Sequence, residues 1–333
     1  MKKVSLLLSI GLLMAACNGH DKNRGETASI LKKPPYAMLT DSILRTGKED
    51  KAGLYYRRGE LLSRNDLHEL AAADFQKAWE LHPDEATGLR YASTLTIISR
   101  LKDAVRLLQE CRKKFPDNLS FSNMLGDLYQ QSGNAKEALQ LYNDMLKTDS
   151  LNFEAWYEKG LLLEKMQDTT SALAALRKAY TLQPVNTYAL ELAHLYAERR
   201  NAAAIDICDA VLRKDSTHEL IDPLFIKGIY YANIGDRKQA ITQFDSCIRR
   251  DWKFTDAYLE KGIVLFHDKK YAAAAEVFQM TIKVSNTYPD GYFWLGRCYE
   301  ATGRKDEAIL FYQRALALDK DFTEAREAIQ RLK

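Results

Sequence analysis

Residues that break or crosslink a fold are scarce in this chain. Its 333 residues include only 7 prolines and 16 glycines, which argues against long disordered segments. There are only 5 cysteines and no C-x-x-C spacing, so a zinc or redox motif of that type is not supported. We expect four cysteines to be buried as small apolar side chains, although a disulfide stays possible in an oxidising compartment. These four are Cys111, Cys208, Cys247 and Cys298.

The chain also lacks an excess of charge of one sign. Its 48 basic and 45 acidic side chains leave a formal net charge of +3. Loss of Lys2 and Lys3 with the leader described below would lower that charge to +1. Nucleic-acid binding needs a concentrated basic face, so we predict no nucleic-acid partner.

Motifs for catalysis and cofactor binding are missing as well. The sequence has no G-x-G-x-x-G, no phosphate-binding P-loop and no H-E-x-x-H. Its histidines never pair at metal-ligand spacing, so we predict no enzyme activity, no cofactor and no metal. His194 could line a binding groove, but a partly exposed polar role is the commoner one. The histidines are His20, His68, His82, His194, His218 and His267.

The N-terminus has the pattern of a secretory leader. Residues 1–16 contain two lysines followed by the apolar run 4–16, which is too short for the roughly 20 residues that span a bilayer. The following Cys17, preceded by Leu-Met-Ala-Ala, resembles the lipobox of bacterial lipoproteins, although Met14 departs from the usual leucine. The alternative is a plain signal peptide with a cysteine nearby by chance.

The lipobox resemblance implies a lipid on Cys17 that anchors the protein to a membrane. Asn18 is not the aspartate that retains such proteins in the inner membrane of enteric bacteria, so we expect the outer membrane and a periplasm-facing domain. The polar stretch 17–35 is expected to be a flexible tether. Residues 36–50 are then expected to form an N-terminal capping helix.

From residue 52 the chain repeats itself with a period of about 34 residues. A small residue lies eleven or twelve positions before each alanine of this series, and six times it is glycine. Glycine inside a helix costs about 1 kcal/mol relative to alanine, so we expect two helices to touch there. The alanines are Ala71, Ala104, Ala138, Ala172, Ala204, Ala240, Ala274 and Ala308, and the small residues are Gly59, Ala92, Gly126, Gly160, Ala193, Gly228, Gly262 and Gly296.

The repeated pattern W-x-x-L-G-x-x-Y, then A-x-x-x-F, resembles the tetratricopeptide repeat over residues 52–321, with close matches at 156–160 and 292–296. The resemblance implies an all-α, right-handed superhelix of about eight helix-turn-helix units. Residues 322–333 have an apolar stripe and a charged outer face, as a capping helix of a solenoid needs. The fifth unit and the connection near 219–223 depart in length, so we expect local irregularity there without a domain break.

The resemblance also implies that first helices line a concave face that binds an extended peptide or a partner helix. Around the small-residue positions the later units are apolar, with acidic residues beside them. We predict a groove for a peptide with apolar anchors and basic flanks. The alternative is that these apolar side chains only pack helix against helix. The predicted groove residues are Tyr157, Leu161, Leu190, Phe225, Ile229, Leu259, Ile263 and Phe293, with the acids Glu158, Glu191, Asp222 and Glu260.

Some family ligands are chaperone C-termini held by a clamp of lysine, asparagine and arginine. Here the clamp positions hold residues such as Tyr157 and Leu190, which excludes that ligand class. The sequence thus predicts a lipid-anchored scaffold or adaptor that binds protein partners at a bacterial cell envelope. Two other classes stay open, namely a structural subunit of an outer-membrane assembly complex without its own peptide ligand, and a wall-binding module.

Overall fold

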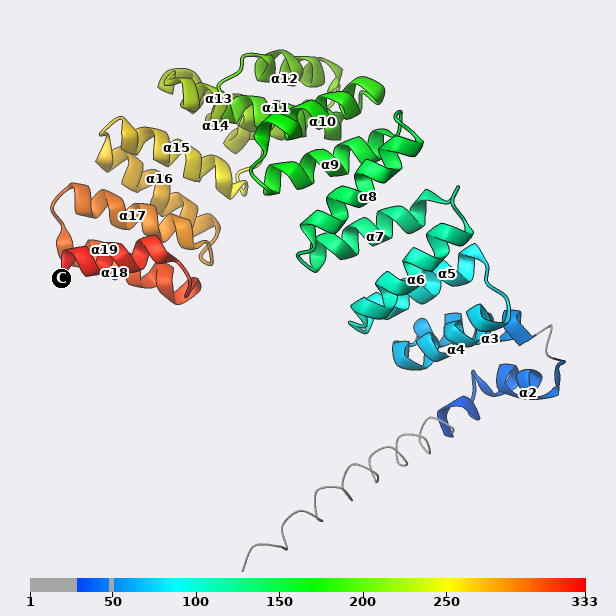
Figure 1. The fold of residues 1–333 in the computed structure, drawn as a ribbon. Helices are drawn as coiled ribbons and strands as arrows, with labels where there is room; N and C mark the ends of the chain where they lie inside the picture. The colour runs from blue at the N-terminus through cyan, green and yellow to red at the C-terminus, as the bar shows by residue number, and fades with distance from the viewer. Residues whose placement is uncertain (1–28, 48–50) are drawn as a thin grey trace, which may run out of the picture. The chain divides into compact units, whose positions relative to one another are not determined.

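Residues 29–47 and 51–333 are described in the computed structural model, and their regular structure is entirely α-helical (Figure 1). The all-α prediction is therefore confirmed. The predicted leader and Cys17 lie outside the described residues. Within the described part, no helix is both long and apolar enough to cross a bilayer.

The chain divides into two compact units, one ending at Leu141 and the other beginning at Tyr142. In the first unit each helix from α2 to α6 packs against the helix that follows it. Its helices are α2 (Ala37–Arg45), α3 (Lys51–Ser63), α4 (His68–Leu81), α5 (Glu85–Ile97), α6 (Leu101–Lys114), α7 (Leu119–Gln131) and the first half of α8 (Ala135–Thr148).

In the second unit each helix from α9 to α18 likewise packs against its successor, and the alternate helices α11, α13, α15 and α17 also contact one another in order. The helices are α9 (Phe153–Lys165), α10 (Thr169–Leu182), α11 (Asn186–Glu198), α12 (Ala203–Lys214), α13 (Asp222–Ile234), α14 (Arg237–Arg250), α15 (Thr255–His267), α16 (Tyr271–Val284), α17 (Pro289–Ala301), α18 (Lys305–Leu318) and α19 (Thr323–Leu332).

From α3 to α18 the described helices fall into eight consecutive pairs, the number that the repeat pattern predicts. In five pairs a large side chain of the second helix lies against the small residue of the first helix. The small residues are Gly59, Gly160, Gly228, Gly262 and Gly296. A Cβ added to Gly160 would lie 2.7 Å from Leu176 Cδ2, and one added to Gly296 would lie 2.8 Å from Tyr312 Cδ1. Close helix approach, the expected reason for the regular spacing of small residues, is therefore confirmed at these glycines.

The fifth pair is irregular, as its sequence predicts. Helix α12 has 12 residues, whereas α10 and α14 have 14 each. The longer connection into α13 is stabilised by the buried Asp215, which accepts hydrogen bonds from the Leu220 amide (3.0 Å) and the Thr217 hydroxyl (2.8 Å). The boundary between the two units lies elsewhere, inside α8.

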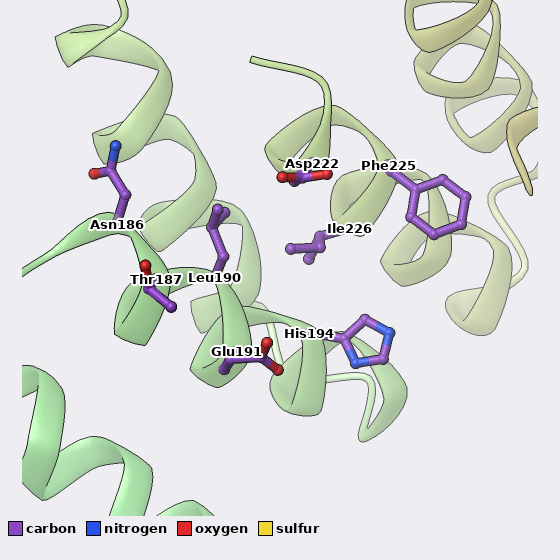
Figure 2. Close-up of a pocket in the computed structure, with 8 residues that line it drawn as sticks. All are labelled: Asn186, Thr187, Leu190, Glu191, His194, Asp222, Phe225 and Ile226. Atoms are coloured by element: carbon purple, nitrogen blue, oxygen red, sulfur yellow. The ribbon is translucent and has the colours of Figure 1, made fainter. Parts of the chain in front are cut away.

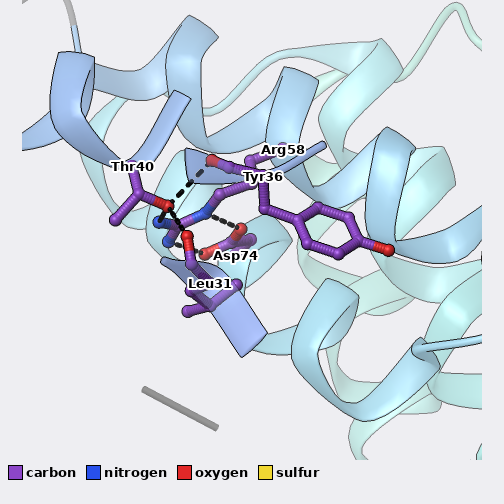
Figure 3. A network of polar contacts seen from close by, with 5 residues as sticks. All are labelled: Leu31, Tyr36, Thr40, Arg58 and Asp74. Carbon is purple, nitrogen blue, oxygen red and sulfur yellow. Dashed lines mark hydrogen bonds and ion pairs between the residues drawn. The ribbon is translucent and has the colours of Figure 1, made fainter. Parts of the chain in front are cut away.

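A buried polar network joins α2 to the first helix pair (Figure 3). The Arg58 guanidinium donates two hydrogen bonds of 2.7 Å to the Asp74 carboxylate and one of 2.9 Å to the Thr40 hydroxyl. That hydroxyl donates to the Leu31 carbonyl at 2.7 Å. The last residues of the expected tether, 29–35, form a short helical turn and further turns, and the Leu31 carbonyl there accepts the hydrogen bond from Thr40 of α2.

Candidate functional site

A hollow of about 550 Å³ lies between α11 and α13 in the second unit (Figure 2). Leu190 on α11 and Ile226 on α13 point into the space between the two helices. Helix α13 begins at Asp222, with Pro223 in its first turn, where a missing N–H costs no hydrogen bond. The lining residues are Asn186, Thr187, Leu190, Glu191, His194, Asp222, Phe225 and Ile226.

Four of the twelve predicted groove residues line this hollow together: Leu190, Glu191, Asp222 and Phe225. Leu190 and Phe225 are half-buried, and Asp222 is exposed. Phe225 also packs edge-on against Phe254 with ring centroids 5.2 Å apart. It therefore contributes both to the hollow and to the packing between helices.

Other predicted apolar residues pack mainly inside the helix layers. Leu259 and Phe293 are only 8% and 7% exposed and belong to two apolar cores. Ile229 and Ile263 are half-buried and pack against cores of the second unit. These four residues show the helix-to-helix packing that the alternative interpretation describes.

A pair of tyrosines forms an aromatic surface on α9 and α11. The rings of Tyr157 and Tyr188 have centroids 4.4 Å apart. Burial, together with the nearby carboxylates of Glu191 and Glu158, raises the pKa of Tyr157 to about 12. The predicted residues Tyr157, Glu158 and Glu191 are thus close enough to interact electrostatically. The predicted Leu161 lies half-buried one turn further along α9.

The acid predicted on α15 has an unusual environment. Burial, with a smaller effect from Asp256, raises the pKa of Glu260 to about 7. Asp256 itself accepts a hydrogen bond of 2.7 Å from the Tyr288 hydroxyl. Glu260 is therefore partly protonated near neutral pH and is a weaker contributor of negative charge than its residue type suggests.

Near the C-terminus, two polar residues of α17 make contacts within the fold. The Arg297 guanidinium lies over the rings of Phe266 and Trp294, 5.2 Å from each centroid. Glu300 accepts hydrogen bonds from Arg331 of α19 at 2.8 Å and from the Tyr312 hydroxyl at 2.5 Å. These contacts attach the last helix to the repeat before it.

The sequence prediction missed a mixed cluster beside the hollow. Ligand atoms of Glu164 on α9 and of His194 and Glu198 on α11 all lie within 4.8 Å of one another. His194 and Glu198 are four residues apart on one helix, which is a visible signal for a shared face. Glu164 comes from the preceding unit, 30 residues before His194, so only the packing of α9 on α11 brings it there.

Comparison with known proteins agrees with the helix pairs. The family model of the tetratricopeptide repeat matches residues 289–322, and a second tetratricopeptide repeat model matches 99–153, 123–187, 157–219 and 227–289. Together these matches cover well over half of the chain.

Two curated proteins are similar in sequence over part of their length. The human protein O-mannosyl-transferase TMTC3 is 23% identical over 290 residues, which is 80% of this chain and 31% of that protein. The Arabidopsis thaliana protein CTR9 homolog is 28% identical over 151 residues, 45% of this chain and 12% of that protein. The chain spans about a third or less of the length of these relatives.

Solved structures share the fold. A tetratricopeptide repeat protein from Parabacteroides merdae has a TM-score of 0.63 at 18% identity, covering 74% of this chain and 97% of that one. The type IV pilus biogenesis factor PilW gives 0.54 at 18% identity, covering 64% and 97%. The Cut9–Hcn1 complex of the APC/C gives 0.53 at 15% identity, covering 87% and 61%.

Proposed function

Because the chain belongs to the tetratricopeptide repeat family, whose fold serves as a scaffold for protein interactions, we propose that its second unit binds an extended segment of a partner protein between α11 and α13. The hollow there is the observation that carries the proposal. It combines an apolar floor, Leu190 and Ile226, with the carboxylates Glu191 and Asp222 at its edge. Such a site suits a segment with apolar anchors and basic flanks.

The surroundings of the hollow support a preference for basic residues. The Tyr157–Tyr188 pair lies on α9 and α11 beside Glu191, an acid of the hollow that adds to the effect of burial in raising the pKa of Tyr157. An aromatic face beside negative charge attracts lysine and arginine side chains by cation–π and Coulomb interactions. The apolar floor would anchor the segment, and the acids would select its charge.

Photo-crosslinking in cells tests this proposal. A photoreactive phenylalanine replaces Leu190 or Thr187 in the hollow, and a matched control replaces Leu310, an exposed residue on α18. We expect the two hollow positions, and not position 310, to capture one protein segment that carries lysine or arginine beside apolar residues. Capture of the same proteins from all three positions would contradict a binding site in the hollow.

A charge variant separates a specific site from adhesion to an apolar surface. Replacing Glu191 and Asp222 together by lysine leaves the apolar floor intact but reverses the charge at the edge of the hollow. The crosslink from position 187 should then be lost. A different result would be equal crosslinking from a position away from the hollow, with no effect of the charge reversal. The protein would then be better described as a structural subunit without its own peptide ligand.

We further propose that Cys17 is lipidated and holds the scaffold at a bacterial cell envelope, on the periplasmic side of the outer membrane. The proposal rests on the leader pattern of residues 1–17. One acyl chain anchors weakly and two or more anchor stably, so the full lipidation pattern is required. Metabolic labelling with a clickable fatty acid should mark the wild-type protein and leave the Cys17→Ser variant unlabelled. Equal labelling of both would contradict the anchor.

A further inference from the structure

Three side chains beside the hollow offer ligand atoms to a single point. They are Glu164 from α9, and His194 and Glu198 from successive turns of α11, with all three ligand atoms within 4.8 Å of one another. Glu164 and His194 are half-buried, whereas Glu198 is exposed. The cluster therefore opens to solvent on one side and is supported by two packed helices on the other.

The electrostatics of this cluster are unfavourable without a cation. Among the described residues, neither Glu164 nor Glu198 forms an ion pair with a lysine or an arginine. Glu191 lies one turn before His194 on α11, so a third carboxylate stands on the same face of that helix. Two facing carboxylates next to a third acid have a strong gain in free energy when a cation binds between them.

We infer that Glu164, His194 and Glu198 form a binding site for one divalent transition-metal ion of the zinc class. One imidazole nitrogen and two carboxylate oxygens form a ligand set that zinc accepts, whereas calcium and magnesium prefer oxygen ligands alone. Zinc–ligand bonds of about 2.0–2.2 Å require the ligand atoms to move inward by roughly 1 Å. The partly exposed side chains can make that movement by small rotamer changes.

The geometry leaves a place for a fourth ligand. Three protein ligands are typical of zinc sites that keep one position open for water or another molecule. His194 also lines the hollow between α11 and α13, so the metal site adjoins the proposed peptide site. A bound metal would lower the negative charge at this end of the hollow. Metal binding itself does not depend on any peptide.

Titration with zinc chloride tests the site directly. The purified full chain, prepared without a polyhistidine tag, is titrated by isothermal calorimetry and by competition with a chromophoric chelator. We expect one zinc ion per chain. Loss of a residue that only supports a metal ligand weakens metal binding about 10–100-fold. Loss of a ligand itself, in Glu164→Gln or His194→Gln, should therefore weaken zinc binding at least about tenfold.

Matched controls keep the outcome decisive. His82→Gln and Glu276→Gln change exposed residues of the same types outside the cluster and should leave zinc affinity unchanged. Glu198→Gln, at an exposed position, serves if a half-buried variant fails to fold, as judged by its circular dichroism. Absence of zinc binding by the wild type, or equal affinity in the cluster and control variants, would overturn the inference. Zinc binding without peptide capture would leave the inference intact and contradict only the proposed function.

Discussion

Gly53 and Gly59 both lie in helix α3, but their surroundings differ. A Cβ on Gly59 would lie 2.8 Å from Cε1 of the fully buried Phe75, whereas nothing lies within 4 Å of a Cβ on the exposed Gly53. We predict that Gly59→Ala lowers the free energy of unfolding by about 1–3 kcal/mol, because Phe75 must leave its place. Gly53→Ala should raise it by up to about 1 kcal/mol through helix propensity.

Chemical unfolding of the two alanine variants beside the wild type measures both effects. The pair shares a helix and a substitution, so the difference reports only the packing of the small-residue position. Similar shifts of both variants in the same direction would contradict close helix approach as the reason for glycine in the repeat.

Glu260 gives a pH dependence whose sign can be stated. Its pKa is about 7 in the fold and 4.5 ordinarily, so the folded protein binds more protons between these values. The cost of the charged, half-buried carboxylate is absent below about pH 4.5 and grows as the pH rises to 7. We predict that Glu260→Gln is more stable than the wild type by about 1–3 kcal/mol at pH 8, and that most of this advantage is lost at pH 5.

The measurement is the free energy of unfolding of both proteins at the two pH values. Other acids titrate in the same range, but they are common to both proteins and cancel in the difference. An advantage of the glutamine variant that is equal at pH 5 and pH 8 would show that Glu260 is not titrating with a raised pKa.

At the scale of the elements, one ion pair fixes how α2 meets the repeats. Arg58 and Asp74 have side chains only 8% and 7% exposed, and Arg58 also holds Thr40 of α2. Removing one member of a buried ion pair leaves an uncompensated charge, so we predict that Asp74→Ala costs about 3–5 kcal/mol. It should also speed amide hydrogen exchange in α2. Arg57→Ala, at an exposed position next to Arg58 on α3, should cost little.

A double variant tests the same contact from the other side. Arg58→Met together with Asp74→Leu removes both charges and keeps apolar volume, so it should recover most of the stability lost in Asp74→Ala. If the double variant is as unstable as the single one, packing and not the uncompensated charge is the cause.

The helices could be predicted from the sequence because their cause is local. The spacing of Gly160 from Ala172, and of Gly296 from Ala308, reports helix pairs directly, and the eight pairs follow from it. The turns of residues 29–35 could not be predicted, because they depend on Thr40 reaching both Leu31 and the side chain of Arg58. Composition alone made that stretch look like a tether.

The candidate site could be predicted only in part, because some of its contacts join residues that are far apart in the sequence. Leu190, Glu191, Asp222 and Phe225 stand at positions where the repeat exposes side chains, so their meeting in one hollow follows from the period. Leu259 occupies an equivalent position but is buried against α16 and α17 by the packing of its neighbours. The cluster of Glu164 with His194 arises between two units, and spacing within one unit could not reveal it.

At the scale of the whole molecule, the central claim is that an apolar hollow with an acidic edge makes this repeat array a receptor for basic, apolar segments. Fluorescence anisotropy with two matched peptides tests it most directly. Both peptides carry the same pair of apolar residues, one flanked by lysines and the other by glutamates, and each is titrated with the purified chain.

Two double variants are compared with the wild type. The hollow variant combines Glu191→Lys with Asp222→Lys, and the control variant combines Asp206→Lys with Glu276→Lys on exposed surfaces of α12 and α16. The account predicts that the lysine-flanked peptide binds the wild type and the control variant, and that the hollow variant loses it. Equal binding of both peptides, or loss of binding in the control variant to the same extent, would contradict the account.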